Sequence, residues 1–150
     1  MMRVLRAALL CCLTVAALAL AACGNSEQND YVDQVNAVQT EFLNAMTAAA
    51  STPPTNASQA GDLISSMEDA FNTAAEDLQA ISPPDEVAEL HQQLIDKMSE
   101  LGDKVSEVGK ALKSGNQQQA QQAAQELQDA LLQAQTDVTD LTTQINDQLG

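Results

Sequence analysis

The chain has 150 residues and a formal net charge of −15, with 21 acidic residues against six basic residues and one histidine. This length suits a single domain of ordinary size. The acidic excess argues against nucleic acid as a partner, because proteins that bind nucleic acid neutralise its phosphates with lysine and arginine.

The first predicted element is an export signal over residues 1–22. Arg3 and Arg6 supply a short basic start, and residues 7–22 are apolar apart from Thr14. A basic start followed by a short apolar stretch is typical of a secretory signal peptide. The stretch is marginal for a membrane-spanning helix, which needs about 20 apolar residues.

The apolar stretch ends in Leu20-Ala21-Ala22-Cys23, which resembles the lipobox of bacterial lipoproteins. In that family an aliphatic residue and two small residues precede an invariant cysteine. The resemblance implies cleavage between Ala22 and Cys23 and attachment of lipid to the Cys23 sulfur. It also implies a lipid-anchored protein on the extracytoplasmic face of the cell membrane, or on the outer membrane of a cell that has two. The alternatives are an ordinary signal peptide with a chance cysteine and an uncleaved anchor.

Cleavage before Cys23 would also remove Cys11 and Cys12, the other two cysteines of the chain. The remaining domain would then hold no disulfide framework. Residues 23–29, which are polar after the cysteine, are expected to form the lipidated N-terminus and a flexible tether.

Four segments then show apolar residues spaced alternately by three and four, which predicts amphipathic helices. They cover about residues 30–50, 58–80, 83–113 and 116–148. Proline pairs at 53–54 and 83–84 separate the first three segments, because proline cannot continue a helix. Ser82 is the expected N-cap of the third helix, and Ser114-Gly115-Asn116 supplies a glycine stop followed by a cap for the fourth.

The predicted fold is therefore all-α, with one bundle domain over residues 30–150. It is an antiparallel bundle of about four helices, two shorter ones and then a long hairpin, preceded by the signal helix and the tether. At 1.5 Å per residue the last two helices would span about 45 Å and the first two about 30–35 Å. The hairpin tip, residues 114–122, is thus expected to project beyond the shorter pair, either as a docking site or as a solvated glutamine-rich helix end.

Residue patterns for catalysis are absent from the sequence. His91 is the only histidine, no glycine-rich elbow surrounds a serine, and phosphate-loop and dinucleotide glycine patterns are missing. Asp62, Asp69 and Glu76 lie seven residues apart on one helix face opposite the apolar stripe, which is typical of a solvated surface. We therefore expect a non-enzymatic protein without a cofactor.

His91 has two interpretations. Heptad spacing through Leu94, Met98 and Leu101 places it on the inner seam of its helix. There it could bind haem iron or copper together with Met98, or with Met46 or Met67. The other interpretation is a hydrogen-bonded histidine among methionines that fill the core.

The leading hypothesis for function is a lipid-anchored interaction or scaffold module of the cell envelope, bound to the membrane through Cys23 and to another envelope protein. The alternative is a ligand-, metal- or haem-binding bundle. Residues 78–94, with Leu78-x-x-Ile81-x-Pro83-Pro84 and Leu90-His91-x-x-Leu94, resemble a helix-break-helix pattern of uncharacterised exported helical-bundle lipoproteins. That resemblance implies no known activity.

Overall fold

The computed structural model describes residues 26–150 of the chain. The predicted signal peptide, the cleavage site between Ala22 and Cys23, and the lipidation site at Cys23 lie outside the described residues. Within residues 26–150, no helix has both the length and the apolar character needed to cross a membrane.

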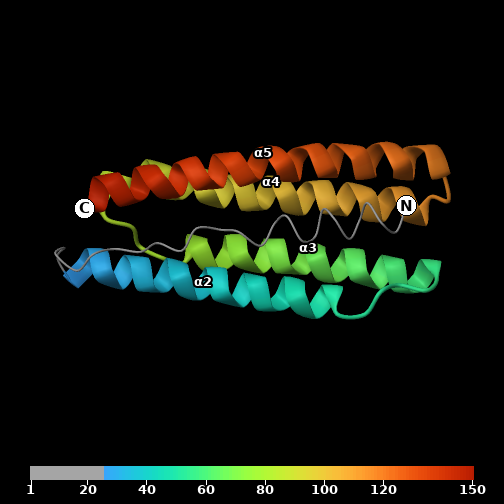
Figure 1. Ribbon diagram of the computed structural model, residues 1–150, viewed down its shortest axis with the longest axis horizontal. Coiled ribbons are helices and arrows are strands. Elements are labelled where there is room, and N and C mark those ends of the chain that lie inside the picture. Colours follow the sequence, from blue (N-terminus) through green and yellow to red (C-terminus); the bar gives the residue numbers. More distant parts are fainter. Residues whose placement is uncertain (1–25) are drawn as a thin grey trace.

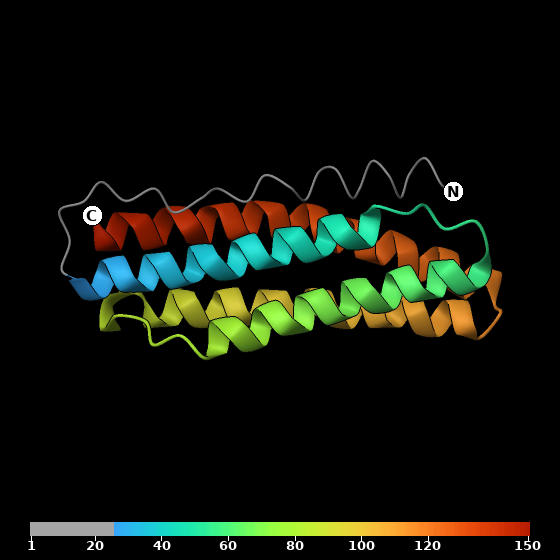
Figure 2. The same cartoon turned by 90° about the horizontal axis from the view of Figure 1, so that it is seen from below.

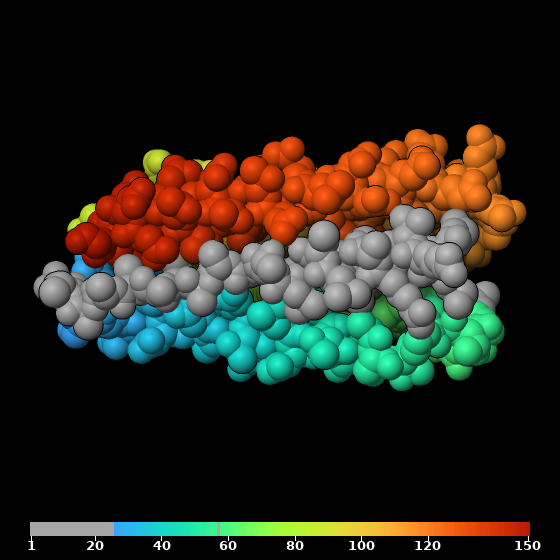
Figure 3. Space-filling view, viewed as in Figure 1, coloured from blue at the N-terminus to red at the C-terminus, as the bar shows by residue number. Residues whose placement is uncertain are grey.

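Within residues 26–150, four long helices run antiparallel along a rod. They are α2 (Ser26–Ala50), α3 (Ala57–Gln79), α4 (Ala88–Lys113) and α5 (Gln117–Leu149), with a single 3-10 turn, η1 (Asp85–Val87), just before α4. Each helix runs opposite to the one before it (Figure 1), and residues 26–150 contain no strand. This confirms the predicted all-α antiparallel bundle. In the space-filling view α2 and α5 lie along opposite long edges of the rod (Figure 3).

Asparagine side chains cap the N-termini of α3 and α5. The Asn56 side-chain oxygen accepts a hydrogen bond from the Gln59 amide at 2.9 Å, and that of Asn116 accepts from the Gln118 and Gln119 amides at 3.1 and 3.2 Å. These bonds satisfy amides that the first turn of a helix leaves unpaired. Before Asn116, Gly115 has a φ of +71°, a left-handed conformation that glycine adopts without steric cost.

The prediction that Ser82 caps a helix starting at residue 83 is wrong. Pro84 is extended, with φ −56° and ψ 147°, η1 begins only at Asp85, and α4 begins at Ala88. A proline disfavours helical backbone in the residue before it, so the proline pair holds both Ser82 and Pro83 out of the helix. The chain therefore crosses from α3 to α4 in an extended segment.

The helix α2 begins at Ser26, four residues before the predicted start. Residues 26–29, expected as part of the tether, form its first turn, and residues 23–25 lie outside the described part of the chain. Glu27 sits in that first turn, where a carboxylate interacts favourably with the positive end of the helix dipole. The polar character of this stretch misled the prediction, because a solvated first turn needs no apolar residue.

The hairpin tip does not project beyond the whole of the shorter pair. The start of α3 reaches about as far along the rod as the turn between α4 and α5, whereas α2 ends well short of it (Figures 1 and 2). The reason is that residues 51–56, which are not helical, carry the chain onward before α3 begins. The tip thus extends beyond α2 alone.

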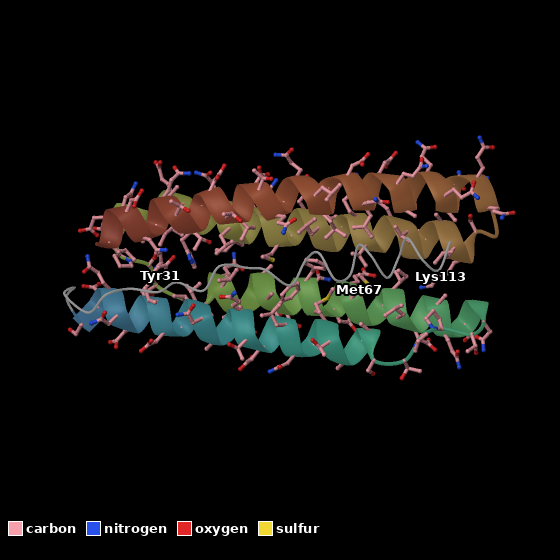
Figure 4. The ribbon with its side chains drawn as sticks, viewed as in Figure 1. Tyr31, Met67 and Lys113 are labelled. Atoms are coloured by element: carbon pink, nitrogen blue, oxygen red, sulfur yellow. The ribbon has the colours of Figure 1, made fainter. Side chains whose placement is uncertain are left out.

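The interior formed by the described helices consists of two apolar clusters placed one after the other along the rod. The first contains Tyr31, Leu78, Leu94 and Ile145 near the start of α2, and the second contains Met46, Met67, Phe71 and Val105 toward the tip. The half-buried Met98 packs against both clusters. Figure 4 shows Tyr31 and Met67 in their respective parts of the bundle.

The helices pack most closely on their neighbours in sequence: α2 on α3, α3 on α4 and α4 on α5. At the α3–α4 seam, a Cβ atom added to Gly102 would lie 2.7 Å from the side-chain oxygen of Asn72, and one added to Gly109 would lie 3.2 Å from Ile64 Cγ2. These two glycines, seven residues apart on α4, therefore allow the close approach of α3. The backbones of α2 and α5 approach each other less closely, although side chains of both helices meet in the apolar cluster that contains Tyr31 and Ile145.

Candidate functional site

A buried tyrosine–histidine pair joins three helices at the end of the rod where α2 begins. Tyr31 of α2 is 1% exposed and His91 of α4 is 3% exposed. The Tyr31 hydroxyl lies 3.2 Å from His91 Nδ1, and His91 Nε2 lies 2.9 Å from the carbonyl oxygen of Leu78 in α3. The two rings meet edge to face, with centroids 5.5 Å apart and planes at 70°.

These contacts determine the tautomer and the charge of His91. A carbonyl oxygen only accepts hydrogen bonds, so Nε2 carries the proton and Nδ1 accepts from the Tyr31 hydroxyl. Burial lowers the pKa of His91, and the hydrogen bond to the Leu78 carbonyl offsets part of that effect. Burial also raises the pKa of Tyr31 to about 12. Both side chains are therefore neutral near pH 7.

The predicted position of His91 on the inner face is confirmed by its burial, but both of its ring nitrogens have partners within the protein. Binding of a metal ion would first have to break one of these hydrogen bonds. Met46 and Met67 belong to the other apolar cluster, and among residues 26–150 no three His, Cys, Asp or Glu side chains are grouped to hold a metal ion. The geometry suits a structural contact that holds three helices together. The sequence did not reveal this contact because Tyr31 and His91 are 60 residues apart.

A second feature is an open groove along the seam of α2 and α3, with a volume of about 520 Å³. Its floor is formed by small or apolar side chains, among them Ala45, Ala48, Ala49, Ala70, Ala74 and Phe42. Its rim carries three carboxylates: Glu41 on the α2 side, and Asp69 and Asp77 on the α3 side. Phe42 anchors one side by packing on Phe71, with ring centroids 5.0 Å apart.

The charges around this groove all have one sign. Every charged side chain of α2 and α3 is a carboxylate, and all lysines of residues 26–150 lie on α4. Two of those lysines pair elsewhere: Lys97 with Glu100 at 2.9 Å and with Asp137 at 3.0 Å, and Lys104 with Glu107 at 3.0 Å. The α2–α3 layer therefore carries negative charge that no cation of its own helices balances.

The hydrogen bonds of these ion pairs also fix the charge states on the α4–α5 side. Hydrogen bonds to Glu100 and then to Asp137 raise the pKa of Lys97. The pKa of Asp137 is lowered by the hydrogen bond from Gln133 and then by that from Lys97. The Lys97 charge is thus held at the α4–α5 seam by Asp137.

The remaining predicted positions are solvent-facing. Asp62, Asp69 and Glu76 are exposed, as expected for a solvated face, although Asp69 also borders the groove, which the spacing alone did not show. In the hairpin tip, residues 114–122 are exposed except for Ala120. The groove had one signal in the sequence, the run of alanines late in the first predicted helix.

No curated protein and no solved structure matches the chain. A family profile does match, over residues 25–148, which includes all but the last residue of the four helices. On this match, the chain belongs to the family of unknown function DUF6376.

Proposed function

We propose that the protein is a non-enzymatic, lipid-anchored interaction module that presents its helical bundle on the outer side of the cell membrane. The support for the anchor is the Leu20-Ala21-Ala22-Cys23 sequence, together with the start of α2 only three residues after Cys23. A lipid on Cys23 would then connect almost directly to the first turn of the bundle. Because the body is acidic, it is repelled by anionic lipid, and the lipid on Cys23 is the proposed membrane attachment.

The observation that supports the interaction role is the apolar groove along α2 and α3. An apolar depression with a polar rim is typical of a surface that another molecule covers. Here Ala45 and Ala48 of the floor are exposed, and the rim carboxylates all have the same charge. The proposed occupant is another protein of the envelope, held near the membrane by this module.

The anchor is tested by labelling cells with radioactive palmitate and isolating the protein. We expect the label to be lost in Cys23→Ala, because the sulfur atom that would carry the lipid is gone. Cys12→Ala is the matched control, since it removes a cysteine from within the predicted signal peptide and should leave the label unchanged. Label that persists in Cys23→Ala would refute the anchor at this residue.

The interaction role is tested by placing a photo-crosslinking amino acid at Ala48, an exposed residue of the groove, in living cells. We expect a discrete crosslinked product in the membrane fraction. The same amino acid at Gln125, an exposed residue of α5, should not give that product. Identical products from both positions, or none from Ala48, would contradict a partner at this groove.

A further inference from the structure

The floor of the α2–α3 groove has a shape that suits a helix. The side chains of Ala45, Ala48 and Ala74 end at Cβ, so the two helices leave a furrow between them where larger residues would interdigitate. Small residues at a helix surface allow another backbone to approach closely. Binding of an amphipathic helix in an apolar groove is one of the recurring modes of peptide recognition.

The geometry points to the chemistry of the occupant: we propose that this groove receives a basic amphipathic helix of a partner protein. The inference rests on the interaction role proposed above and adds the chemical nature of the partner. It follows from the apolar floor, which selects for an apolar stripe, and from the acidic rim, which selects for flanking lysine or arginine.

The spacing of the rim carboxylates fits a helix that lies along the groove. Asp69 and Asp77 are eight residues apart on α3, which is about 12 Å along the helix axis at 1.5 Å per residue. Lysines or arginines seven or eight residues apart on the partner helix would match that distance on one flank. A third basic residue on the opposite flank would meet Glu41 across the groove.

A second copy of this chain fits the groove less well. Its α2–α3 layer is equally acidic, and like charges placed face to face repel each other. Lys97 and Lys104 have the matching spacing of seven residues, but both are half-buried and already paired with carboxylates of their own chain. Lys110 and Lys113 are exposed near the tip (Lys113 is labelled in Figure 4) but lie only three residues apart. That separation is about 4.5 Å along the axis, too short to reach both Asp69 and Asp77.

The test uses the protein purified in the form that the cell produces and a synthetic helical peptide of about 15 residues, long enough to span the groove. The peptide carries leucines on one face, two lysines seven residues apart on one flank and one lysine on the other. Titration calorimetry at near-physiological salt should show saturable binding of one peptide per protein. The triple variant Glu41→Gln, Asp69→Asn, Asp77→Asn should weaken binding about tenfold or more, or ~1.4 kcal/mol.

The matched control is the triple variant Asp30→Asn, Asp33→Asn, Asp62→Asn. It removes the same charge from exposed positions of the same two helices outside the groove, and should change binding by less than about twofold, as expected for distant exposed charges. A peptide with serines in place of the leucines should not bind measurably.

Four results would overturn the inference. Equal weakening by both triple variants would mean general attraction between opposite charges, and equal binding of the serine peptide would mean that the apolar floor is not used. Sedimentation that shows dimers in the wild type and monomers only in the groove variant would assign the groove to a second copy. If crosslinking at Ala48 traps a partner while the peptide does not bind, the interaction role stands and only the basic-helix inference fails.

Discussion

Removal of the Tyr31 hydroxyl tests whether the buried tyrosine–histidine pair holds α2 on the bundle. In Tyr31→Phe the ring is retained, but His91 Nδ1 loses its donor at a site where the histidine is 3% exposed. A typical hydrogen bond contributes about 0.5–1.5 kcal/mol, and a buried acceptor left unsatisfied costs about 1–3 kcal/mol. We therefore expect the free energy of unfolding to fall by about 1–3 kcal/mol.

The assay is urea denaturation monitored by far-ultraviolet circular dichroism. The midpoints of the variants are compared with the same dependence of the unfolding free energy on urea concentration. His91→Phe and the double variant complete a mutant cycle. Because the two residues share one hydrogen bond, the double variant should lose less stability than the sum of the single variants, with a coupling of about 0.5–3 kcal/mol. Additive single variants, or a wild-type midpoint for Tyr31→Phe, would refute the reasoning.

Four other predictions concern His91 and three glycines. Because burial lowers the pKa of His91, the unfolded state binds more protons below its own pKa of about 6.5. The wild type should therefore lose stability relative to His91→Phe as the pH falls through that value and down to the folded-state pKa, by up to ~1.4 kcal/mol per pH unit. Urea titrations at several pH values measure this, and parallel pH profiles would contradict it. Gly109→Leu should destabilise by about 1–3 kcal/mol by overpacking against Ile64, whereas Gly61→Ala, with nothing within 4 Å, should stabilise by about 0.5–1 kcal/mol. Gly115→Ala should cost about 1–2 kcal/mol, because its φ is +71°. Thermal unfolding checks the glycine variants, and a stabilised Gly109→Leu or an unaffected Gly115→Ala would count against the packing and turn assignments.

The helical spacing of apolar residues was sufficient to predict the four helices and their antiparallel order. It also placed His91 on the inner face, because a seven-residue count from Leu101 requires only local information. The residues at which the helices begin and end were harder to predict. The Pro83–Pro84 pair permits either a helix start or an extended break, and the choice depends on how far the chain must travel between α3 and α4.

The pairing of Tyr31 with His91 and the α2–α3 groove lay beyond sequence reasoning for a different reason. Both depend on which helix faces which, and a single sequence carries no register between segments 60 residues apart. Gly102 and Gly109 show the same limit. Their spacing of seven was visible in the sequence, but only the position of Ile64 and Asn72 shows that they admit a close neighbour.

The packing of each helix mainly on its neighbour in sequence also bears on how the chain reaches its native state. Most tertiary contacts form within hairpins of consecutive helices. The α2 and α5 backbones approach each other less closely, although Tyr31 and Ile145 belong to the same buried cluster. Helical proteins whose contacts are local in sequence fold in microseconds to milliseconds, because little loop-closure entropy is lost before contacts form. A chain that is synthesised with α2 first can build this bundle one hairpin at a time.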